Sequence, residues 1–317
     1  MSTLIETKGL KKYFPTPHGM LHAVDDVNIK IEEGHTLGVV GESGCGKSTL
    51  GRTLIHLHES TDGQIFFEGK DVTHVGKSEL KALREQMQII FQDPYSSIDP
   101  RMTVKETIKE PLQISGRFSK GEIEDAAEEL MNLVGLDQRL RNAYPHELDG
   151  GRRQRVGIGR ALALNPKFIV CDEPVSALDV SIQAQVLNLL KRLQQERKLT
   201  YMFVTHDMSV VRHISDEICV MYLGQVVELA PSKELFRNPL HPYTKALLDA
   251  IPSTDIHHSR KRELIRGELT SPINPKDECR FCARCKYASE CCHKPQKLVE
   301  VSPGHFVSCT RVDEVNG

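Results

Sequence analysis

The 317-residue sequence lacks three features that would assign it to a membrane, to nucleic acid or to the cell exterior. No apolar run approaches the roughly 18 residues that a membrane-spanning helix needs. Its 41 basic residues are matched by 43 acidic ones, which argues against a basic nucleic-acid-binding surface over the whole protein. The start, Met1–Glu6, has no basic segment leading into an apolar stretch, so we expect no export signal. These absences predict a cytoplasmic protein that reaches a membrane only through a partner.

Cysteine is sparse along most of the chain and dense near its end. Six of the nine cysteines fall between Cys279 and Cys309. In a reducing compartment such a cluster binds metal more often than it forms disulfides. The length fits about two domains, and the composition turns polar, basic and proline-rich after residue 251. We therefore predict a first domain over 1–255 and a cysteine-rich extension over 256–317.

The hydrophobic pattern predicts an α/β fold. Strand patterns occur at residues 27–31, 37–40, 64–67, 168–171, 201–204, 218–222 and 226–229. Helices are predicted at 122–133 and over a segment with apolar residues at 182, 186, 189, 190 and 193, which share one face. A strand, a helix and another strand in that order imply a parallel sheet.

Residues Gly41–Thr49 read G-E-S-G-C-G-K-S-T, directly after the strand at 37–40 and before a helical stretch, and they match a phosphate-binding loop. The three glycines let backbone N–H groups converge on phosphate oxygens. Lys47 would place its charge by the β- and γ-phosphates, and Ser48 would offer a hydroxyl to Mg²⁺. The alternatives are a chance glycine-rich turn and, for Cys45, a redox sensor rather than a passive position. The candidate nucleotide-binding residues are Gly41, Glu42, Ser43, Gly44, Cys45, Gly46, Lys47, Ser48 and Thr49.

Two carboxylates end the apolar strand at 168–171. Asp172 is expected to hold Mg²⁺, and Glu173 to polarise the water that attacks the γ-phosphate. By itself the pair could equally be a solvated strand end. Beside a phosphate loop it predicts nucleotide hydrolysis.

Over roughly residues 1–255 these and four further motifs resemble the ATP-binding cassette (ABC) ATPases. Gln92 in F-Q-D-P is similar to the Q-loop glutamine, L-D-G-G-R at 148–152 to the signature motif, S-A-L-D at 176–179 to the D-loop, and His206 in T-H-D to the switch histidine. The resemblance implies a P-loop NTPase (RecA-like) core with an antiparallel β subdomain and a helical subdomain at about 95–165. It makes Glu173, His206 and Gln92 catalytic, with Gln92 also near Mg²⁺.

The resemblance further implies that two cassettes pack head to tail, so that each signature closes on the partner's nucleotide. Asp149, Gly150, Gly151 and Asp179 would then contact nucleotide, and Tyr13 would stack on adenine unless it is an ordinary strand aromatic. Asp149 stands where serine is expected, and Arg152 where glutamine is. A carboxylate about 4 Å from a phosphate charge costs on the order of 4 kcal/mol at an effective dielectric near 20. We hypothesise an impaired composite site unless Arg152 or Arg153 neutralises the charge.

The segments F-Q-D-P-Y-S-S-I-D-P-R-M at 91–102 and H-P-Y-T-K-A-L-L at 241–248 are similar to ATPases of oligopeptide and dipeptide importers. That resemblance implies a second, different ATPase subunit, two transmembrane permease subunits and an extracytoplasmic substrate-binding protein, with this chain peripheral on the cytoplasmic face of the membrane. Related importers carry nickel or oligosaccharides. The rival hypotheses are a soluble ABC ATPase acting on nucleic acid or ribosomes, which the near-neutral charge disfavours, and a kinase, which leaves the signature unexplained.

The cysteine-rich tail also resembles that subfamily. Cys279, Cys285, Cys292 and Cys309 form a candidate four-thiolate site for a [4Fe–4S] cluster or Zn²⁺. The irregular gaps fit a zinc ribbon poorly, so we favour the iron–sulfur cluster, with a metal-free tail as the third alternative. The expected cofactors are thus ATP, Mg²⁺ and this cluster.

Overall fold

The computed structural model describes residues 2–251, 267 and 271–316. The chain divides into two compact units, the first formed by residues 1–74 with 203–317 and the second by residues 75–202. The predicted boundary at residue 255 lies outside the described residues. Within the described ranges, no helix is both long and apolar enough to cross a bilayer.

An antiparallel sheet opens the first unit. Its strands are β1 (Thr3–Thr16), β2 (Gly19–Val27), β3 (Lys30–Glu32), β5 (Asp62–Phe67) and β6 (Lys70–Asp71), in the order β2-β1-β5-β6 with β3 also on β1. The single strand predicted at 27–31 is wrong. The backbone turns at Asp26, whose φ is 54°, and the Asn28 side chain accepts a bond from Gly9 N at 2.8 Å, which separates β2 from β3.

A second set of strands in the first unit carries the phosphate-binding segment. It runs β4 (Thr36–Val40), β10 (Glu217–Tyr222), β11 (Gln225–Pro231), β13 (His305–Val307) and β12 (Val299–Ser302). β4 and β10 are parallel, and the others pair antiparallel. The helices of this unit are α1 (Lys47–Leu54), α8 (Met208–Ile214), α9 (Ser232–Arg237), α10 (Pro242–Asp249) and α11 (Val312–Asn316), with short 3₁₀ turns at Cys282–Arg284 and Glu290–His293.

A buried hydrogen-bonded pair of side chains fixes the tail strands to this sheet. His305 Nε2 lies 2.7 Å from Glu228 Oε1, and both side chains are fully buried. The same carboxylate accepts bonds from the backbone N–H groups of Leu240 and His241. Because a buried charge is costly unless it is paired and hydrogen-bonded, this cluster holds β13 against β11.

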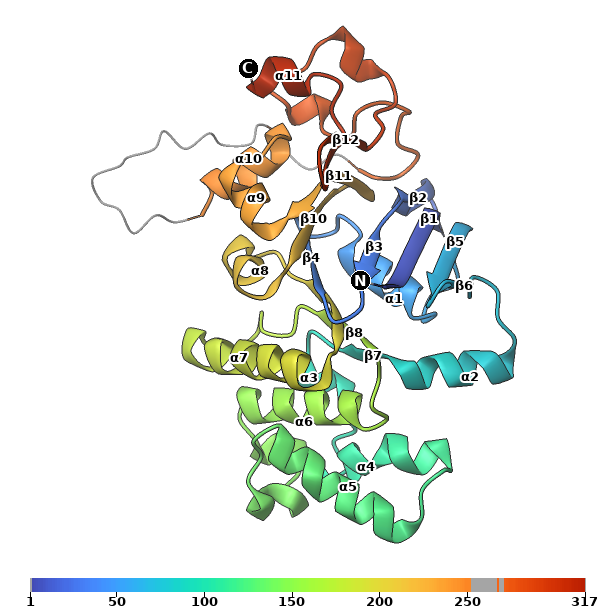
Figure 1. Ribbon diagram of the computed structural model, residues 1–317, viewed down its shortest axis with the longest axis vertical. Helices are drawn as coiled ribbons and strands as arrows, with labels where there is room; N and C mark the ends of the chain where they lie inside the picture. Colours follow the sequence, from blue (N-terminus) through green and yellow to red (C-terminus); the bar gives the residue numbers. More distant parts are fainter. Residues whose placement is uncertain (1, 252–266, 268–270, 317) are drawn as a thin grey trace, which may run out of the picture. The chain divides into compact units, whose positions relative to one another are not determined.

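The second unit is mainly helical. Strands β7 (Met87–Ile90) and β8 (Phe168–Asp172) are parallel, and the helices are α2 (Lys77–Gln86), α3 (Pro94–Ser97), α4 (Val104–Ser115), α5 (Lys120–Leu133), α6 (Gly150–Leu162) and α7 (Val180–Arg197), with 3₁₀ turns at Gln138–Asn142 and Pro145–Glu147. Figure 1 shows α4, α5 and α6 lying beside one another. Capping boxes at Thr103 and Ser119 start α4 and α5, which explains why α5 begins before the predicted residue 122. The chain leaves this unit within β9 (Thr200–Val204).

Candidate functional site

The predicted phosphate loop connects β4 to α1 in the first unit. Gly46 caps α1 with a φ of 102°, and a Cβ at this position would lie 1.9 Å from the carbonyl oxygen of Ala23. Only glycine fits both the left-handed backbone and this close approach. The loop therefore needs glycine here for its own conformation, independently of any ligand.

Lys47 is folded back onto the loop. Its Nζ donates to the carbonyl oxygens of Gly41 at 2.8 Å and Glu42 at 2.9 Å, and the residue is only 4% exposed. These bonds satisfy a buried ammonium in the absence of phosphate. A bound phosphate would exchange them for contacts with its own oxygens.

Cys45 lies inside the loop with its side chain buried. Burial raises the pKa of its thiol, against the opposing effect of the nearby Lys47 charge. Since the thiolate is the reactive species, the structure favours the passive interpretation of Cys45 over a redox sensor.

Tyr13 is held on β1 by a small polar network. Its ring stacks on His22 with centroids 3.8 Å apart, and its hydroxyl donates to the carboxylate of Asp25. Burial raises the pKa of Asp25, but the bonds from Tyr13 and His22 and the charge of Arg280 lower it below its usual range overall. Asp25 is thus an acceptor that fixes the orientation of the Tyr13 ring.

Two arginines of the cysteine-rich segment contact these residues, which no sequence motif predicted. The Arg284 guanidinium donates to Glu42 Oε2 at 2.6 Å and Oε1 at 3.1 Å, and to the Tyr222 hydroxyl at 3.2 Å. Arg280 donates to Asp25. The partners are 242 and 255 residues apart in the chain, too far for any local sequence signal.

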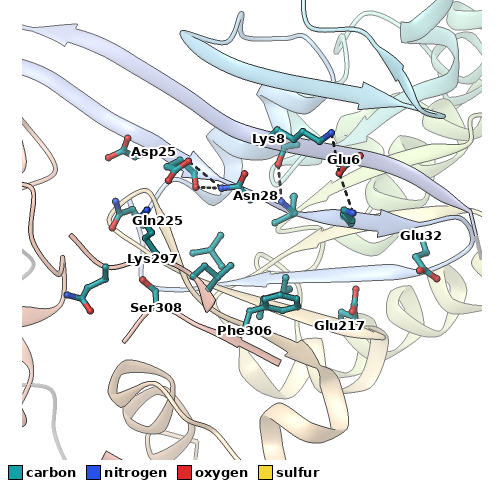
Figure 2. Close-up of a pocket in the computed structure, with 18 residues that line it drawn as sticks. Glu6, Lys8, Asp25, Asn28, Glu32, Glu217, Gln225, Lys297, Phe306 and Ser308 are labelled. Atoms are coloured by element: carbon teal, nitrogen blue, oxygen red, sulfur yellow. Dashed lines mark hydrogen bonds and ion pairs between the residues drawn. The ribbon is translucent and has the colours of Figure 1, made fainter. Parts of the chain in front are cut away.

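A cavity of about 780 Å³ borders this network. It is lined by residues of β1 to β3 and by residues of the C-terminal strands, and Figure 2 shows Asp25 at its edge with Gln225 and Lys297 nearby. Glu32 and Glu217 lie toward its other end. The Asp25 carboxylate is therefore part of a cavity wall, where Arg280 supplies a neighbouring charge.

His206 belongs to the first unit. It follows β9 in an exposed position, and the next residue, Asp207, caps α8 by accepting a bond from Ser209 N at 2.7 Å. The cap fixes the turn that presents His206.

In the second unit the structure brings together two of the predicted catalytic residues. Gln92 Nε2 donates to Glu173 Oε2 at 3.0 Å. Asp172 is fully buried at the end of β8, and Glu173 next to it has a φ of 47°. A left-handed backbone is strained for a residue with a side chain, and such strain concentrates at functional sites.

Asp149 is the N-cap of α6. Its carboxylate accepts from Arg152 N at 2.7 Å and lies 3.4 Å from the Arg152 guanidinium, so Arg152 is the neutralising partner foreseen from the sequence. Both side chains are about half exposed, so the pair is weak. Impairment of a composite site at Asp149 remains a prediction.

The glycine that follows is required by packing. A Cβ at Gly151 would lie 2.5 Å from Ile182 Cγ2, at the start of α7. Asp179 caps α7 by accepting from Ile182 N at 3.0 Å. The signature-like and D-loop-like segments therefore meet at the starts of α6 and α7.

All six tail cysteines are free thiols. Burial, with a smaller contribution from the neighbouring thiols Cys292 and Cys309, raises the pKa of Cys279 to about 12. Burial and the same two neighbours raise the pKa of Cys285 as well. Nevertheless, in the described part of the chain no three His, Cys, Asp or Glu side chains are placed to hold a metal ion. The predicted metal-binding group is therefore not found among the described residues.

The sequence matches two family models. Residues 24–176 match a model described as ABC transporter, and residues 227–292 match one described as the C-terminal region of oligopeptide/dipeptide transporters. The second match covers most of the cysteine-rich segment, which the sequence alone had set apart as an extension.

Curated relatives match over nearly the whole chain. The oligopeptide transport ATP-binding protein AppF of Bacillus subtilis is 49% identical over 97% of both chains. The OppF proteins of Salmonella typhimurium and Escherichia coli are 51% and 50% identical, covering 96% and 97% of this chain and 92% and 93% of their own.

Solved structures agree. A dimeric post-hydrolysis state of the ATP-binding cassette MJ0796, bound to ADP and phosphate, matches with a TM-score of 0.67 and 31% identity over 72% of this chain and 99% of that one. CbiO1 of Clostridium perfringens, part of the transporter complex cbiONQ, matches with a TM-score of 0.68 and 26% identity, over 75% and 92%.

Proposed function

Because this chain belongs to the ABC transporter family of ATP-binding proteins, we propose that it is the ATP-hydrolysing subunit of an oligopeptide importer. The observation that carries the proposal is the near-full-length identity of about half the residues to oligopeptide transport ATP-binding proteins, tail included. This similarity favours peptides over nickel or oligosaccharides, and a transporter over a soluble ATPase on nucleic acid or ribosomes.

The first unit supplies the nucleotide-binding residues. Lys47 would leave the carbonyls of Gly41 and Glu42 to bind the β- and γ-phosphates, and the start of α1 would direct its N–H groups at them. Ser48 would place its hydroxyl at Mg²⁺, and the face of the Tyr13 ring opposite His22 would stack on adenine. ATP and Mg²⁺ are the expected substrate pair of this family.

The hydrolytic residues in this proposal lie at or just after the ends of β7, β8 and β9. Asp172 would hold Mg²⁺ with Gln92, and Glu173, already bonded to Gln92, would accept a proton from the attacking water. His206 would orient that water and the γ-phosphate. ATP is thereby cleaved to ADP and phosphate, with the water oxygen forming the new bond to phosphorus.

Two copies of the fold are needed for turnover in this proposal. The N-terminus of α6, with Gly150 and Gly151, would contact the nucleotide bound by a second ATPase subunit. We propose that this second subunit is a different chain. Asp149 and Asp179 would flank that contact. Clamping and release of the pair would drive movement in the membrane subunits.

A groove on the second unit offers a place for a membrane subunit. It has a volume of about 500 Å³, is lined by α2 and α4, and combines three basic residues (Lys77, Lys81, Arg84) and two carboxylates (Glu85, Glu110) with the 68%-exposed Ile114. We take its occupant to be a short cytoplasmic helix of a permease subunit that presents apolar and charged residues. This contact would hold the chain peripherally on the cytoplasmic membrane face, with the substrate-binding protein contacted only indirectly.

Reconstituted transport tests the function. We expect vesicles holding the two permeases, both ATPases and the binding protein to take up a labelled tripeptide when ATP is present. Replacing Ile114 with Glu should reduce uptake at least tenfold, because a charge cannot enter an apolar contact cheaply. The exposed Phe118→Glu variant, outside the groove lining, is the matched control. Uptake of nickel or an oligosaccharide in place of the peptide would contradict the substrate, and undiminished uptake with Ile114→Glu would contradict the docking site.

We propose that Cys279, Cys285, Cys292 and Cys309 hold a [4Fe–4S] cluster. The donor set fits, because burial and then the neighbouring Cys292 thiol raise the pKa of Cys279, Cys285 and Cys309, which indicates that the four sulfurs lie near one another. The four thiolates would hold the cluster. The irregular spacing of the cysteines fits a zinc ribbon poorly and favours the cluster over Zn²⁺.

Anaerobic purification tests the cluster. We expect brown protein with a broad absorbance near about 400 nm and about four irons per chain. Cys285→Ala should lose most of the iron because one ligand is gone, while Cys291→Ala, at an exposed thiol outside the set, should keep it. Colourless protein loaded with zinc, or full iron content in Cys285→Ala, would contradict the assignment.

A further inference from the structure

The cysteine-rich segment contacts the phosphate loop at a residue whose charge is unfavourable there. Glu42 is the second residue of the loop, so its carboxylate is a negative charge within the segment that is expected to bind phosphate. Like charges close together oppose binding, and the opposition is strong where water is scarce. A loop with an unpaired Glu42 would therefore bind nucleotide weakly.

Arg284 cancels that charge. Its guanidinium makes a two-pronged pair with both oxygens of Glu42 and is itself 8% exposed, while the Glu42 side chain is 23% exposed. Planar two-pronged pairs of this kind are the stronger class of charged hydrogen bonds and fix geometry as well as charge. The Glu42 N–H also donates to the Tyr243 hydroxyl at 2.8 Å, so the loop's second residue is held from both main chain and side chain.

An aromatic cluster holds Arg284 in place. The Tyr222 hydroxyl accepts a further hydrogen bond from the Arg284 guanidinium. The rings of Tyr222 and Phe281 lie edge to face with centroids 5.2 Å apart. Phe281 is buried and lies three residues before Arg284 in the tail. The arginine is thus presented to the loop by a packed surface.

Arg280 acts near Tyr13, the residue proposed to stack on adenine, and not at the phosphate loop. It pairs with Asp25, the carboxylate that accepts the Tyr13 hydroxyl and bonds His22 at 3.3 Å. Without Arg280 the partly buried Asp25 would lose its only arginine partner among the described residues. The Tyr13 ring would then be less firmly oriented.

We infer that Arg284 and Arg280 are positioning residues for nucleotide, the first by neutralising Glu42 in the phosphate loop and the second by fixing Tyr13 through Asp25. This goes beyond the proposed function, and only the Arg280 part rests on the proposed stacking of Tyr13 on adenine. In this inference the cysteine-rich tail contributes residues to the nucleotide-binding site. Its attachment does not depend on these arginines, because the His305–Glu228 pair and the bond from Met20 N to Asn274 also fix it.

Binding of two probes to the full-length protein tests the inference. ADP reports on both ends of the site and pyrophosphate on the phosphate loop alone, each with Mg²⁺. We expect Arg284→Gln to raise the Kd about tenfold for both probes, the size typical of losing one charge-assisted pair. Arg280→Gln should raise the Kd for ADP about fivefold and leave that for pyrophosphate unchanged, because Tyr13 contacts only the base. The control is Arg311→Gln, a tail arginine that pairs with Glu314 and should change neither.

A double variant separates charge cancellation from simple loss of packing. If Arg284 works by neutralising Glu42, adding Glu42→Gln to Arg284→Gln removes the unpaired carboxylate and should restore the Kd to within about twofold of Glu42→Gln alone. No recovery, or a Kd for Arg284→Gln equal to the parent's, overturns the Arg284 part. Equal losses for ADP and pyrophosphate in Arg280→Gln overturn the Arg280 part. A parent protein that binds neither probe would instead refute the proposed function.

Discussion

Lys47→Ala is expected to abolish ATP hydrolysis, lowering the rate at least about a hundredfold in the reconstituted transporter. Lys47 is the first residue of α1, and the bonds of its ammonium to the carbonyls of Gly41 and Glu42 place that charge against the loop. Removing it takes a positive charge away from the β- and γ-phosphates, so ATP binding should weaken together with turnover. Calorimetry with ATP and a phosphate-release assay measure the two effects.

The control for this variant must separate lost binding from lost folding, because Lys47 is buried. Its removal leaves two carbonyl oxygens without a donor, at a cost of about 1–3 kcal/mol in the free energy of unfolding. Lys70→Ala removes a lysine at the exposed turn into β6 and should leave hydrolysis unchanged. A folded Lys47→Ala protein that hydrolyses ATP at the parental rate would refute the assignment of the loop.

Local chemistry explains why the phosphate loop could be predicted from sequence. The buried strand at 36–40, the glycine spacing and the start of α1 at Lys47 all lie within about twenty residues, and each is dictated by its own neighbours. The contact of Gln92 with Glu173 was harder to predict from the sequence, since 81 residues separate them. The motifs that contain these residues indicated a separate role for each and no contact between them.

The cysteine-rich tail makes long-range contacts that sequence patterns did not predict. Its cysteines suggested a site, but nothing in the chain indicated that the arginines beside Cys279 and Cys285 pair with Asp25 and Glu42. Ion pairs between residues so far apart have no periodicity and depend on how the tail packs. The error at residues 27–31 has the opposite origin. The alternation there is real, but side-chain bonds of Asn28 outweigh it and end the strand.

Glu173→Gln is expected to lower hydrolysis by about a hundredfold to ten-thousandfold while ATP binding is retained, the range typical of losing a general base. The amide keeps the size of the carboxylate, and its carbonyl oxygen can still accept the bond from Gln92, so the strained backbone at residue 173 should stay in place. What is lost is the capacity to take a proton from water. Pre-steady-state phosphate release measures the chemical step apart from binding.

Comparison variants make this result specific to the base. Glu129→Gln removes an exposed carboxylate that pairs with Arg197 in the same unit and should leave turnover unchanged. Gln92→Ala should cost about tenfold, because Glu173 remains but loses a bond that orients it. If Glu173→Gln hydrolyses ATP within a few-fold of the parent while His206→Ala does not, the proton acceptor is the histidine. The strained backbone at Glu173 would then serve only to end β8, and the catalytic assignment of the carboxylate would be wrong.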